Sequence, residues 1–285
     1  MRSETAVSAR ALLAEGASSL EAAGIGDAGR EARRLWANLP GEPPGHALLH
    51  PDDPVLPERA AAYASAVARR ATGEPLAYVT GWTGFRHLTL RCDRRALIPR
   101  PETEGLVDLV LARAPTGRIA DVGTGSGCLA LSLAAEGGYQ EVLAVDLSAA
   151  ALGLAAENAR LVDAPVALVR GDLCSPFRPG GLDALVSNPP YLTAGEYAVL
   201  DSAVRDWEPA LALASGTDGL EATTRIMDEG RRVVRPGGWL ALEIDCTRSA
   251  DCAGRAGALG WTDVAIHADL FGRERYLLAR RSDAS

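Results

Sequence analysis

The chain reads Arg118-Ile119-Ala120-Asp121-Val122-Gly123-Thr124-Gly125-Ser126-Gly127 at the point where a short apolar run passes into a glycine-rich turn. Glycine allows backbone conformations that are closed to other residues, so the main chain of such a turn can approach a ligand closely. The residues that follow, 126–136, have the apolar spacing of a helix, whose first N–H groups face the turn. A strand, a glycine turn and a helix in this order predict a ligand site at the end of the strand.

Strands and helices continue to alternate beyond this turn. Besides the strand at 118–122, the apolar patterns predict strands at 141–146, 166–170, 182–187, 239–244 and 273–280 and helices at 148–161 and 220–234. This alternation favours a mostly parallel, doubly wound sheet with right-handed crossovers. The predicted fold class is therefore α/β.

The N-terminal part of the chain has a helical pattern instead. Ser3 and Asp27 are suitable caps for two helices, the second of which ends at Pro40. Pro57 suits the first turn of a third helix, which ends at Gly73. These elements predict a small helical domain, which serves either as a scaffold or dimerisation bundle or for substrate docking.

A short β segment is predicted between the two parts. Leu88 and Leu90 alternate with polar residues and are followed by Leu97-Ile98, a pattern that suggests a β-hairpin. We therefore expect three parts: a helical domain at 1–75, a linker with a β-hairpin at 76–100, and the α/β domain at 101–285.

Composition narrows the function. The 285 residues are 47% hydrophobic and 23% charged, as in ordinary globular proteins. None of the 29 basic residues is Lys, which rules out a Walker A phosphate loop, a lysine Schiff base and a pyridoxal anchor. The net charge is −8, and acidic residues outnumber Arg both before and after residue 80, so we expect no direct nucleic-acid binding.

Cysteine usage and hydropathy indicate a reducing compartment. The five cysteines are odd in number and include no Cys-x-x-Cys pair, which argues against a disulfide framework and a zinc site. No apolar run reaches the roughly 20 residues of a membrane helix, and the N-terminus shows no apolar signal segment. We expect a cytoplasmic monomer that holds no metal and does not contact a membrane.

The spacing of the glycines indicates the kind of ligand. A dinucleotide fingerprint would place Gly or Ala at Cys128, whereas the tighter Gly-x-Gly-x-Gly of residues 123–127 is more typical of enzymes that use S-adenosylmethionine. Asp146, at the end of the second strand, is placed to accept hydrogen bonds from both ribose hydroxyls, and it could also cap the helix at 148–161. Leu173, in a Gly-Asp-Leu turn after the third strand, is placed to line the adenine.

The fourth strand ends in Asn188-Pro189-Pro190-Tyr191. The two prolines fix backbone torsions and remove two N–H donors, which leaves a rigid loop rich in acceptors beside an aromatic ring. Such a loop could be a simple turn. It also suits a planar –NH2 group, because two acceptors can hold both hydrogens and aim the nitrogen at a sulfonium methyl. The predicted nucleophile is an amide or an exocyclic base amine, and the predicted catalytic residues are Asn188, Pro189 and Tyr191.

With these motifs, the sequence resembles the bacterial-type peptide chain release factor glutamine methyltransferases. The similarity covers about residues 55–280 and extends beyond the two motifs. The further stretches are Gly73-Glu74-Pro75-Leu76-Ala77-Tyr78, Thr80-Gly81, Phe85, Leu97-Ile98-Pro99-Arg100-Pro101-Glu102-Thr103-Glu104, Val204-Arg205-Asp206-Trp207-Glu208-Pro209, Ala212-Leu213, Asp218-Gly219-Leu220, Asp269, Gly272 and Arg275.

The resemblance implies a Rossmann-like class I methyltransferase sheet. It implies methylation of the amide N5 of the glutamine in the Gly-Gly-Gln loop of class I release factors, with the helical domain docking that protein. It further implies three sets of residues. S-adenosylmethionine would be held by Gly123, Thr124, Gly125, Ser126, Gly127, Asp146, Leu173 and Asn188. The glutamine pocket would be formed by Asn188, Pro189, Pro190 and Tyr191, and the site would be covered by Arg100, Glu102 and Thr103.

The chain departs from the family pattern at a few positions. After the fifth strand the family usually has Glu-x-Gly and then a Gln nearby, whereas this chain has Glu243-Ile244-Asp245 and then Arg248. Position 207 is Trp where Phe is common, and the first 40 residues resemble the family only as a helical domain.

Other functions are compatible with the motifs. A glutamine methyltransferase of a ribosomal protein would use the same chemistry. An N6-adenine methyltransferase of DNA or RNA shares the Asn-Pro-Pro-Tyr loop, but we would expect it to have a basic groove and a base-reading domain. A binding protein with an inactive methyltransferase fold would be expected to have damaged motifs, and here Asp146 and residues 188–191 are intact.

Overall fold

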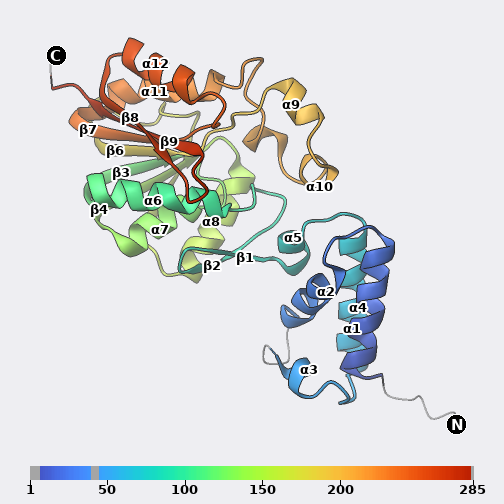
Figure 1. The fold of residues 1–285 in the computed structure, drawn as a ribbon. Helices are drawn as coiled ribbons and strands as arrows, with labels where there is room; N and C mark the ends of the chain where they lie inside the picture. The colour runs from blue at the N-terminus through green and yellow to red at the C-terminus, as the bar shows by residue number, and fades with distance from the viewer. Residues whose placement is uncertain (1–6, 40–44, 284–285) are drawn as a thin grey trace, which may run out of the picture. The chain divides into compact units, whose positions relative to one another are not determined.

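The computed structural model describes residues 7–39 and 45–283 (Figure 1). The predicted cap at Ser3 and helix end at Pro40 lie outside these residues. The chain divides into two compact units. The first runs up to Gly81 and also includes Ser202–Trp207, and the second contains Trp82–Asp201 and the chain from Glu208 onward. The segment that we predicted as a linker, 76–100, is thus divided between the units at Gly81.

A central sheet with the strand order β5-β4-β3-β6-β7-β9-β8 forms the framework of the second unit. Neighbouring strands from β5 to β7 pair in parallel, and β9 is antiparallel to both β7 and β8. The mostly parallel α/β fold predicted from the sequence is confirmed. The strand bounds are β3 Thr116–Val122, β4 Gly138–Asp146, β5 Val166–Arg170, β6 Leu182–Ser187, β7 Val234–Glu243, β8 Trp261–Ala268 and β9 Glu274–Arg281.

Helices cover both faces of this sheet (Figure 1). α6, α7 and α8 lie on one face and α11 and α12 on the other. Because successive strand residues point to opposite faces, each face of the sheet has its own hydrophobic core. In β3, for example, Ile119 packs in the core under α6 and α7, while Ala120 packs in the core under α11 and α12. The helix bounds are α6 Pro101–Arg113, α7 Cys128–Glu136, α8 Ala149–Leu161, α9 Ala194–Ala198, η1 Ala210–Ala212, α11 Glu221–Val233 and α12 Ser249–Ala258.

The first unit is helical and has its own core. Leu20, Leu35, Trp36 and Tyr63 are buried together there. Its helices are α1 Ala9–Ala22, α2 Ala28–Ala37, α3 His46–Leu49, α4 Pro57–Ala71, α5 Leu76–Thr80 and α10 Ser202–Arg205.

The helix ends in this unit agree with the sequence only in part. Pro57 begins α4, and Gly73 follows its last turn with φ +90°, as predicted. Ser8 caps α1 by accepting a hydrogen bond from the Ala11 N–H at 3.3 Å. Asp27 precedes α2 as predicted, but it has φ 53° and its side chain makes no capping bond.

The β-hairpin is present but uses a different pair of strands. β1 (Trp82–Phe85) pairs with β2 (Leu88–Arg91), so the prediction that Leu97-Ile98 takes part was wrong. Residues 92–100 form neither strand nor helix, and Pro99 and Pro101 lack the N–H donors that a strand would need. The sequence patterns also missed α12, β8 and the short helices α3, α5, α9 and α10, and they gave no bounds for α6.

Replacing Gly16 in α1 by alanine should destabilise the first unit. An added Cβ would lie 2.2 Å from the Tyr63 hydroxyl oxygen, and Tyr63 is buried in α4. We expect Gly16→Ala to lower the free energy of unfolding by about 1–3 kcal/mol despite the better helix propensity of alanine.

Gly254→Ala is the matched control, because Gly254 is exposed in α12 and an added Cβ there meets no atom within 4 Å. It should stabilise the protein by about 0.5–1 kcal/mol. Denaturant unfolding measures both changes, and equal effects from the two variants would contradict the packing described.

Candidate active site

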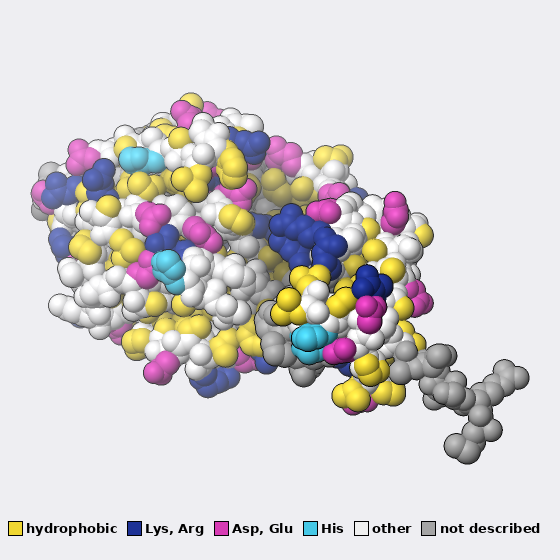
Figure 2. Space-filling model, turned by 60° about the horizontal axis from the view of Figure 1, so that its bottom comes forward, with side chains coloured by type: hydrophobic (Ala, Val, Ile, Leu, Met, Phe, Trp, Pro, Cys, Tyr) yellow, Lys and Arg dark blue, Asp and Glu magenta, His cyan; other side chains and the backbone are white. Residues whose placement is uncertain are grey.

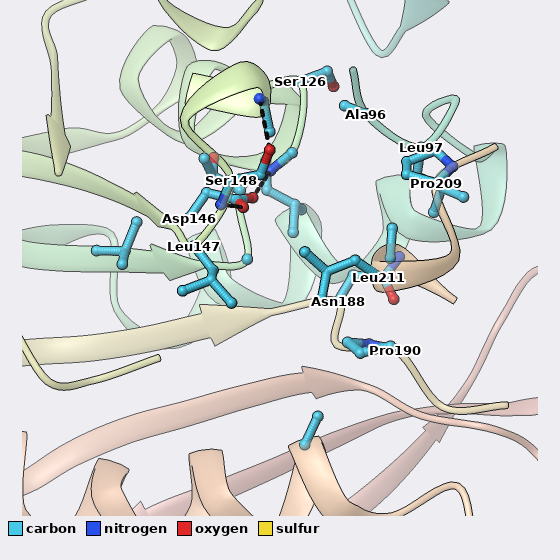
Figure 3. A pocket seen from close by; sticks show the side chains of 18 of the residues that line it. Ala96, Leu97, Ser126, Asp146, Leu147, Ser148, Asn188, Pro190, Pro209 and Leu211 are labelled. Carbon is cyan, nitrogen blue, oxygen red and sulfur yellow. Dashed lines mark hydrogen bonds between the residues drawn. The ribbon is translucent and has the colours of Figure 1, made fainter. Parts of the chain in front are cut away.

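Three adjacent strands, β4, β3 and β6, open at their carboxyl ends onto one cavity of about 350 Å³. The segments after these strands line it, together with residues 95–103 and 209–216. Asp146 and Ser148 lie on one side of the cavity, and Asn188 and Pro190 lie on the other (Figure 3). The structure therefore brings the two motifs predicted from the sequence to one site.

The glycine turn adopts the conformation that its composition requires. Gly123, Gly125 and Gly127 all have positive φ, at 75°, 56° and 86°. An added Cβ at Gly123 would meet no atom within 4 Å, so this part of the turn faces open space. Gly127 is not among the residues that line the cavity, and its backbone instead lies close to Leu131 and Ala155.

Asn158 fixes the turn from behind. It is fully buried in α8, and its side-chain amide donates to the Ser126 carbonyl at 2.9 Å. The same amide bonds the main chain of Arg91 in β2, accepting from its N–H at 2.7 Å and donating to its carbonyl at 3.2 Å. No motif in the sequence marked this residue.

Asp121, at the end of β3, supports the same turn. Its carboxylate accepts hydrogen bonds from the Thr124 hydroxyl at 2.6 Å and the Ala130 N–H at 3.2 Å. Burial raises the pKa of Asp121 to about 7, and nearby Asp146 acts in the same direction. The hydrogen bonds from Thr124 and Ala130 act in the opposite direction.

The Asp146 carboxylate connects two main-chain segments of the site. One oxygen accepts from the Gly125 N–H at 2.9 Å and the other from the Ser148 N–H at 2.8 Å. The capping role that we considered for Asp146 is taken by Ser148, whose hydroxyl accepts from the Ala151 N–H at 3.2 Å. Asp146 lines the cavity, and a carboxylate has about four acceptor positions, so lone pairs remain for a ligand.

Leu173 lies in the turn after β5 and also lines the cavity. Its φ of 45° is unusual for a residue other than glycine. The preceding Gly171 N–H donates to the Asp146 carbonyl at 3.1 Å, which holds this turn against the end of β4.

The Asn-Pro-Pro-Tyr loop follows β6 directly. Asn188 and Pro190 line the cavity, whereas Pro189 and Tyr191 are not among its lining residues. Burial raises the pKa of Tyr191 to about 12, with Glu243 contributing in the same direction, so this phenol stays protonated at neutral pH. The Asn188 side-chain amide donates to the Thr103 hydroxyl at 3.1 Å.

A buried carboxylate lies behind Thr103. The Thr103 hydroxyl donates to Glu243 at 2.6 Å, and the two side chains come from the first turn of α6 and the end of β7. Burial raises the pKa of Glu243 to about 7, while Thr103, Arg275 and Arg100 act to lower it. The sequence analysis noted Glu243 only as part of a departure from the family pattern.

Arg100 does not extend freely over the site. Its guanidinium pairs with Glu208, which is buried and also accepts from the Ile98 N–H at 3.0 Å. This pair holds the segment before α6 against the segment after α10, and both segments contribute walls to the cavity.

The unusual residues after β7 form an ion-pair network at the rim. Arg248 pairs with Asp245 at 2.9 Å and with Glu196 of α9 at 2.6 Å. An added Cβ on the nearby Gly219 would lie 2.5 Å from the Tyr191 carbonyl oxygen and 3.2 Å from Arg248. Asp245 and Arg248, which depart from the family pattern, thus form ion pairs that connect the segments packed around the Asn-Pro-Pro-Tyr loop.

Residues 7–39 and 45–283 contain neither a cluster of metal ligands nor a helix that could span a membrane. His46 and His50 have the i,i+4 spacing of a metal pair, and their ring centroids are 4.8 Å apart. No group of three or more His, Cys, Asp or Glu side chains in the described ranges could hold a metal ion. None of the described helices is long and apolar enough to cross a membrane.

Known proteins match both units. Residues 11–81 match the family described as PrmC N-terminal domain, and residues 102–212 match the family described as methyltransferase small domain. The release factor glutamine methyltransferase of Cereibacter sphaeroides is 43% identical over 263 residues, which cover 92% of this chain and 94% of that protein. That of Deinococcus radiodurans is 38% identical over 276 residues, covering 96% and 98%. The chain belongs to the release factor glutamine methyltransferase family.

Solved methyltransferase structures share the family's fold. A methyltransferase from Pyrococcus furiosus has a TM-score of 0.52 and 19% identity, over 68% of this chain and 88% of that one. The hMettl16 catalytic domain, in complex with the MAT2A 3′UTR hairpin 6, has a TM-score of 0.55 and 16% identity, over 82% and 86%. The sheet therefore has the fold of solved methyltransferases, as the resemblance implied.

Asp121→Asn should become relatively more stable as the pH rises. The pKa of Asp121 is about 7 in the folded protein, against an ordinary value of 3.8. Between these two pH values the folded protein therefore binds a proton that the unfolded chain releases. This contribution to stability is present at low pH and is lost as the pH rises through about 7.

We expect the unfolding free energy of Asp121→Asn minus that of the wild type to increase by about 2–3 kcal/mol between about pH 5 and pH 8. Glu243 shifts in the same direction but is present in both proteins, so it cancels. Denaturant unfolding at several pH values measures the difference, and a difference independent of pH would contradict the buried, protonated carboxyl.

Proposed function

We propose that this protein transfers a methyl group from S-adenosylmethionine to the amide N5 of the glutamine in the Gly-Gly-Gln motif of class I release factors. The proposal rests above all on the shared cavity, which joins the Gly123–Gly127 turn to Asn188. Family membership favours the release factor as the protein substrate. We further propose that the helical unit docks that protein.

The cavity fits the proposed cofactor. Its volume of about 350 Å³ lies in the usual range for small-molecule sites. Open space in front of Gly123 admits a ligand close to the main chain, and Asp146 retains acceptor positions for ribose hydroxyls. We assign the ribose to Asp146, the adenine to Leu173, and the remaining cofactor contacts to residues 123–126 and Asn188, whereas Gly127 lies outside the cavity lining and shapes the turn.

The residues around Asn188 supply what a weak nucleophile needs. An amide nitrogen has a delocalised lone pair, so its orientation must be imposed. We propose that the Asn188 carbonyl oxygen accepts one N–H of the substrate and that a main-chain carbonyl of the Asn-Pro-Pro-Tyr loop accepts the other. Pro190 lines the same cavity, and we place Pro189 and Tyr191 beside the substrate amide, outside the lining of that cavity. S-adenosylmethionine supplies an electrophilic methyl group, whose bond to sulfur breaks as the new bond to nitrogen forms. One of the two nitrogen protons is then released to water, and the donor is left as S-adenosylhomocysteine.

The nucleic-acid alternative has less support. Figure 2 shows acidic and basic side chains interspersed over the face in view, with one larger group of Arg and no continuous basic stripe among the described residues of that face. The net charge of −8 also opposes binding to a phosphate backbone. A ribosomal protein as substrate is distinguished only by experiment.

Methylation of an intact class I release factor tests the proposal. The full chain is incubated with S-adenosylmethionine and the release factor, and the Gly-Gly-Gln peptide is examined by mass spectrometry. We expect one added methyl group on glutamine and none when that glutamine is replaced by alanine. Ribosomal proteins and duplex DNA are tested in parallel. Methylation of either one without methylation of the release factor would overturn the assignment.

Asp146→Ala should remove the preference for an intact ribose. We expect the wild type to bind S-adenosylhomocysteine about 10- to 100-fold more tightly than its 2′,3′-dideoxy analogue, because two hydrogen bonds to a charged acceptor are lost. In Asp146→Ala the two ligands should bind about equally, whatever happens to the turn. Calorimetric titration of both ligands measures this.

Asp263→Asn, an exposed carboxylate on β8 outside the cavity, is the control and should keep the wild-type ratio. A ratio in Asp146→Ala equal to that of the wild type would remove Asp146 from the ribose site.

A further inference from the structure

Three side chains far apart in the sequence form a hydrogen-bonded chain that ends at the site. Asn188 donates to Thr103 at 3.1 Å, and Thr103 donates to Glu243 at 2.6 Å. Thr103 and Glu243 are each only 2% exposed. Ser187 of β6 pairs with Leu242 of β7, so Asn188 and Glu243 are the next residues along two adjacent parallel strands.

The direction of these hydrogen bonds follows from counting protons. An ionised carboxylate can only accept, so above about pH 7, where Glu243 is mostly ionised, the single hydrogen of the Thr103 hydroxyl is committed to Glu243. The hydroxyl oxygen can then only accept from its other neighbour. The Asn188 group that faces it must therefore be the –NH2.

The orientation of the Asn188 amide toward Thr103 determines where its carbonyl oxygen points. If the amide turned over, two oxygens would face each other with no hydrogen between them, in a place closed to water. With the –NH2 held by Thr103, the carbonyl oxygen is directed away from Thr103 and is free to accept from a substrate. The two ends of an amide are similar in shape, so packing alone would not make this distinction.

We propose that Thr103 and Glu243 are positioning residues, which act through hydrogen bonds to fix the orientation of the Asn188 amide so that its carbonyl oxygen accepts an N–H of the substrate amide. The inference rests on the proposed function and adds two residues to its site. Neither side chain touches the reacting nitrogen. Both act by excluding the turned-over amide, in which a donor would face the substrate –NH2.

Thr103→Val and Thr103→Ser separate this role from simple packing. Valine keeps the shape of threonine and removes the hydroxyl, whereas serine keeps the hydroxyl. We expect Thr103→Val to lower kcat about 10- to 100-fold, with the dissociation constant for S-adenosylhomocysteine changed by less than about threefold. Thr103→Ser should keep kcat within about threefold of the wild type.

Thr223→Val is the matched control, because Thr223 is also buried and lies outside the cavity lining. It should leave kcat unchanged. Rates are corrected for the folded fraction, measured by denaturant unfolding. A Thr103→Val enzyme that loses stability but keeps its kcat, or a Thr103→Ser enzyme as slow as Thr103→Val, would overturn the proposal.

A double-mutant cycle tests whether Thr103 acts through Asn188. Single-turnover methylation is followed by mass spectrometry in Asn188→Ala and in Asn188→Ala/Thr103→Val. Once the amide is absent, removing the hydroxyl should change the rate by less than about twofold. If Thr103→Val lowers the rate by the same factor in the Asn188→Ala protein as in the wild type, Thr103 acts independently of Asn188 and the inference fails. If the wild type does not methylate the release factor at all, the proposed function fails instead.

Discussion

Parallel pairing of β4, β3, β6 and β7 is the constraint on which the site depends. Because the carboxyl ends of parallel strands meet at one edge, Asp146, the glycine turn, Asn188 and Glu243 follow one another along that edge in the order of the strands. The cofactor half of the proposed site therefore lies over β4 and β3, and the amide half over β6 and β7. No loop has to fold back to bring the two halves together.

Side-chain oxygens and amides hold the main chain of this edge in place. Asp146 and Glu208 accept hydrogen bonds from N–H groups of segments that line the cavity, and Asp121 accepts from the Ala130 N–H at the start of α7. Asn158 donates to the Ser126 carbonyl of the glycine turn. Loops after strands cannot satisfy their own N–H groups as helices do, so such acceptors replace water. The cavity wall is thus built from several short segments, each tied to a different buried or half-buried polar side chain.

The sequence predicted well those features that depend on short, local stretches, such as strand bounds and motifs. β5 and β6 begin and end at the predicted residues, and the two motifs meet at one cavity because both follow strands of the same sheet. The contacts it missed join distant residues. Thr103 and Glu243 are 140 positions apart, and Ile98 and Glu208 are 110 apart, so neither pair leaves a periodic or local signal. The edge strand β8 was missed as well, because its apolar residues do not alternate with polar ones and most of its residues are exposed or half-buried.

Burial makes the carboxyl groups of Asp121 and Glu243 costly to ionise in the folded protein. Burial raises the pKa of each carboxyl to about 7, so both groups are partly ionised at neutral pH. The ionised form of each is less well solvated in the protein interior than in water, which lowers the stability of the folded state. The same burial removes water as a competitor for the hydrogen bonds that each group makes to Thr124, Ala130 or Thr103. A solvated carboxylate in either place would let the glycine turn or the Asn188 amide adopt several arrangements. The buried carboxylates limit them to one, and the stability lost is the cost of that single arrangement.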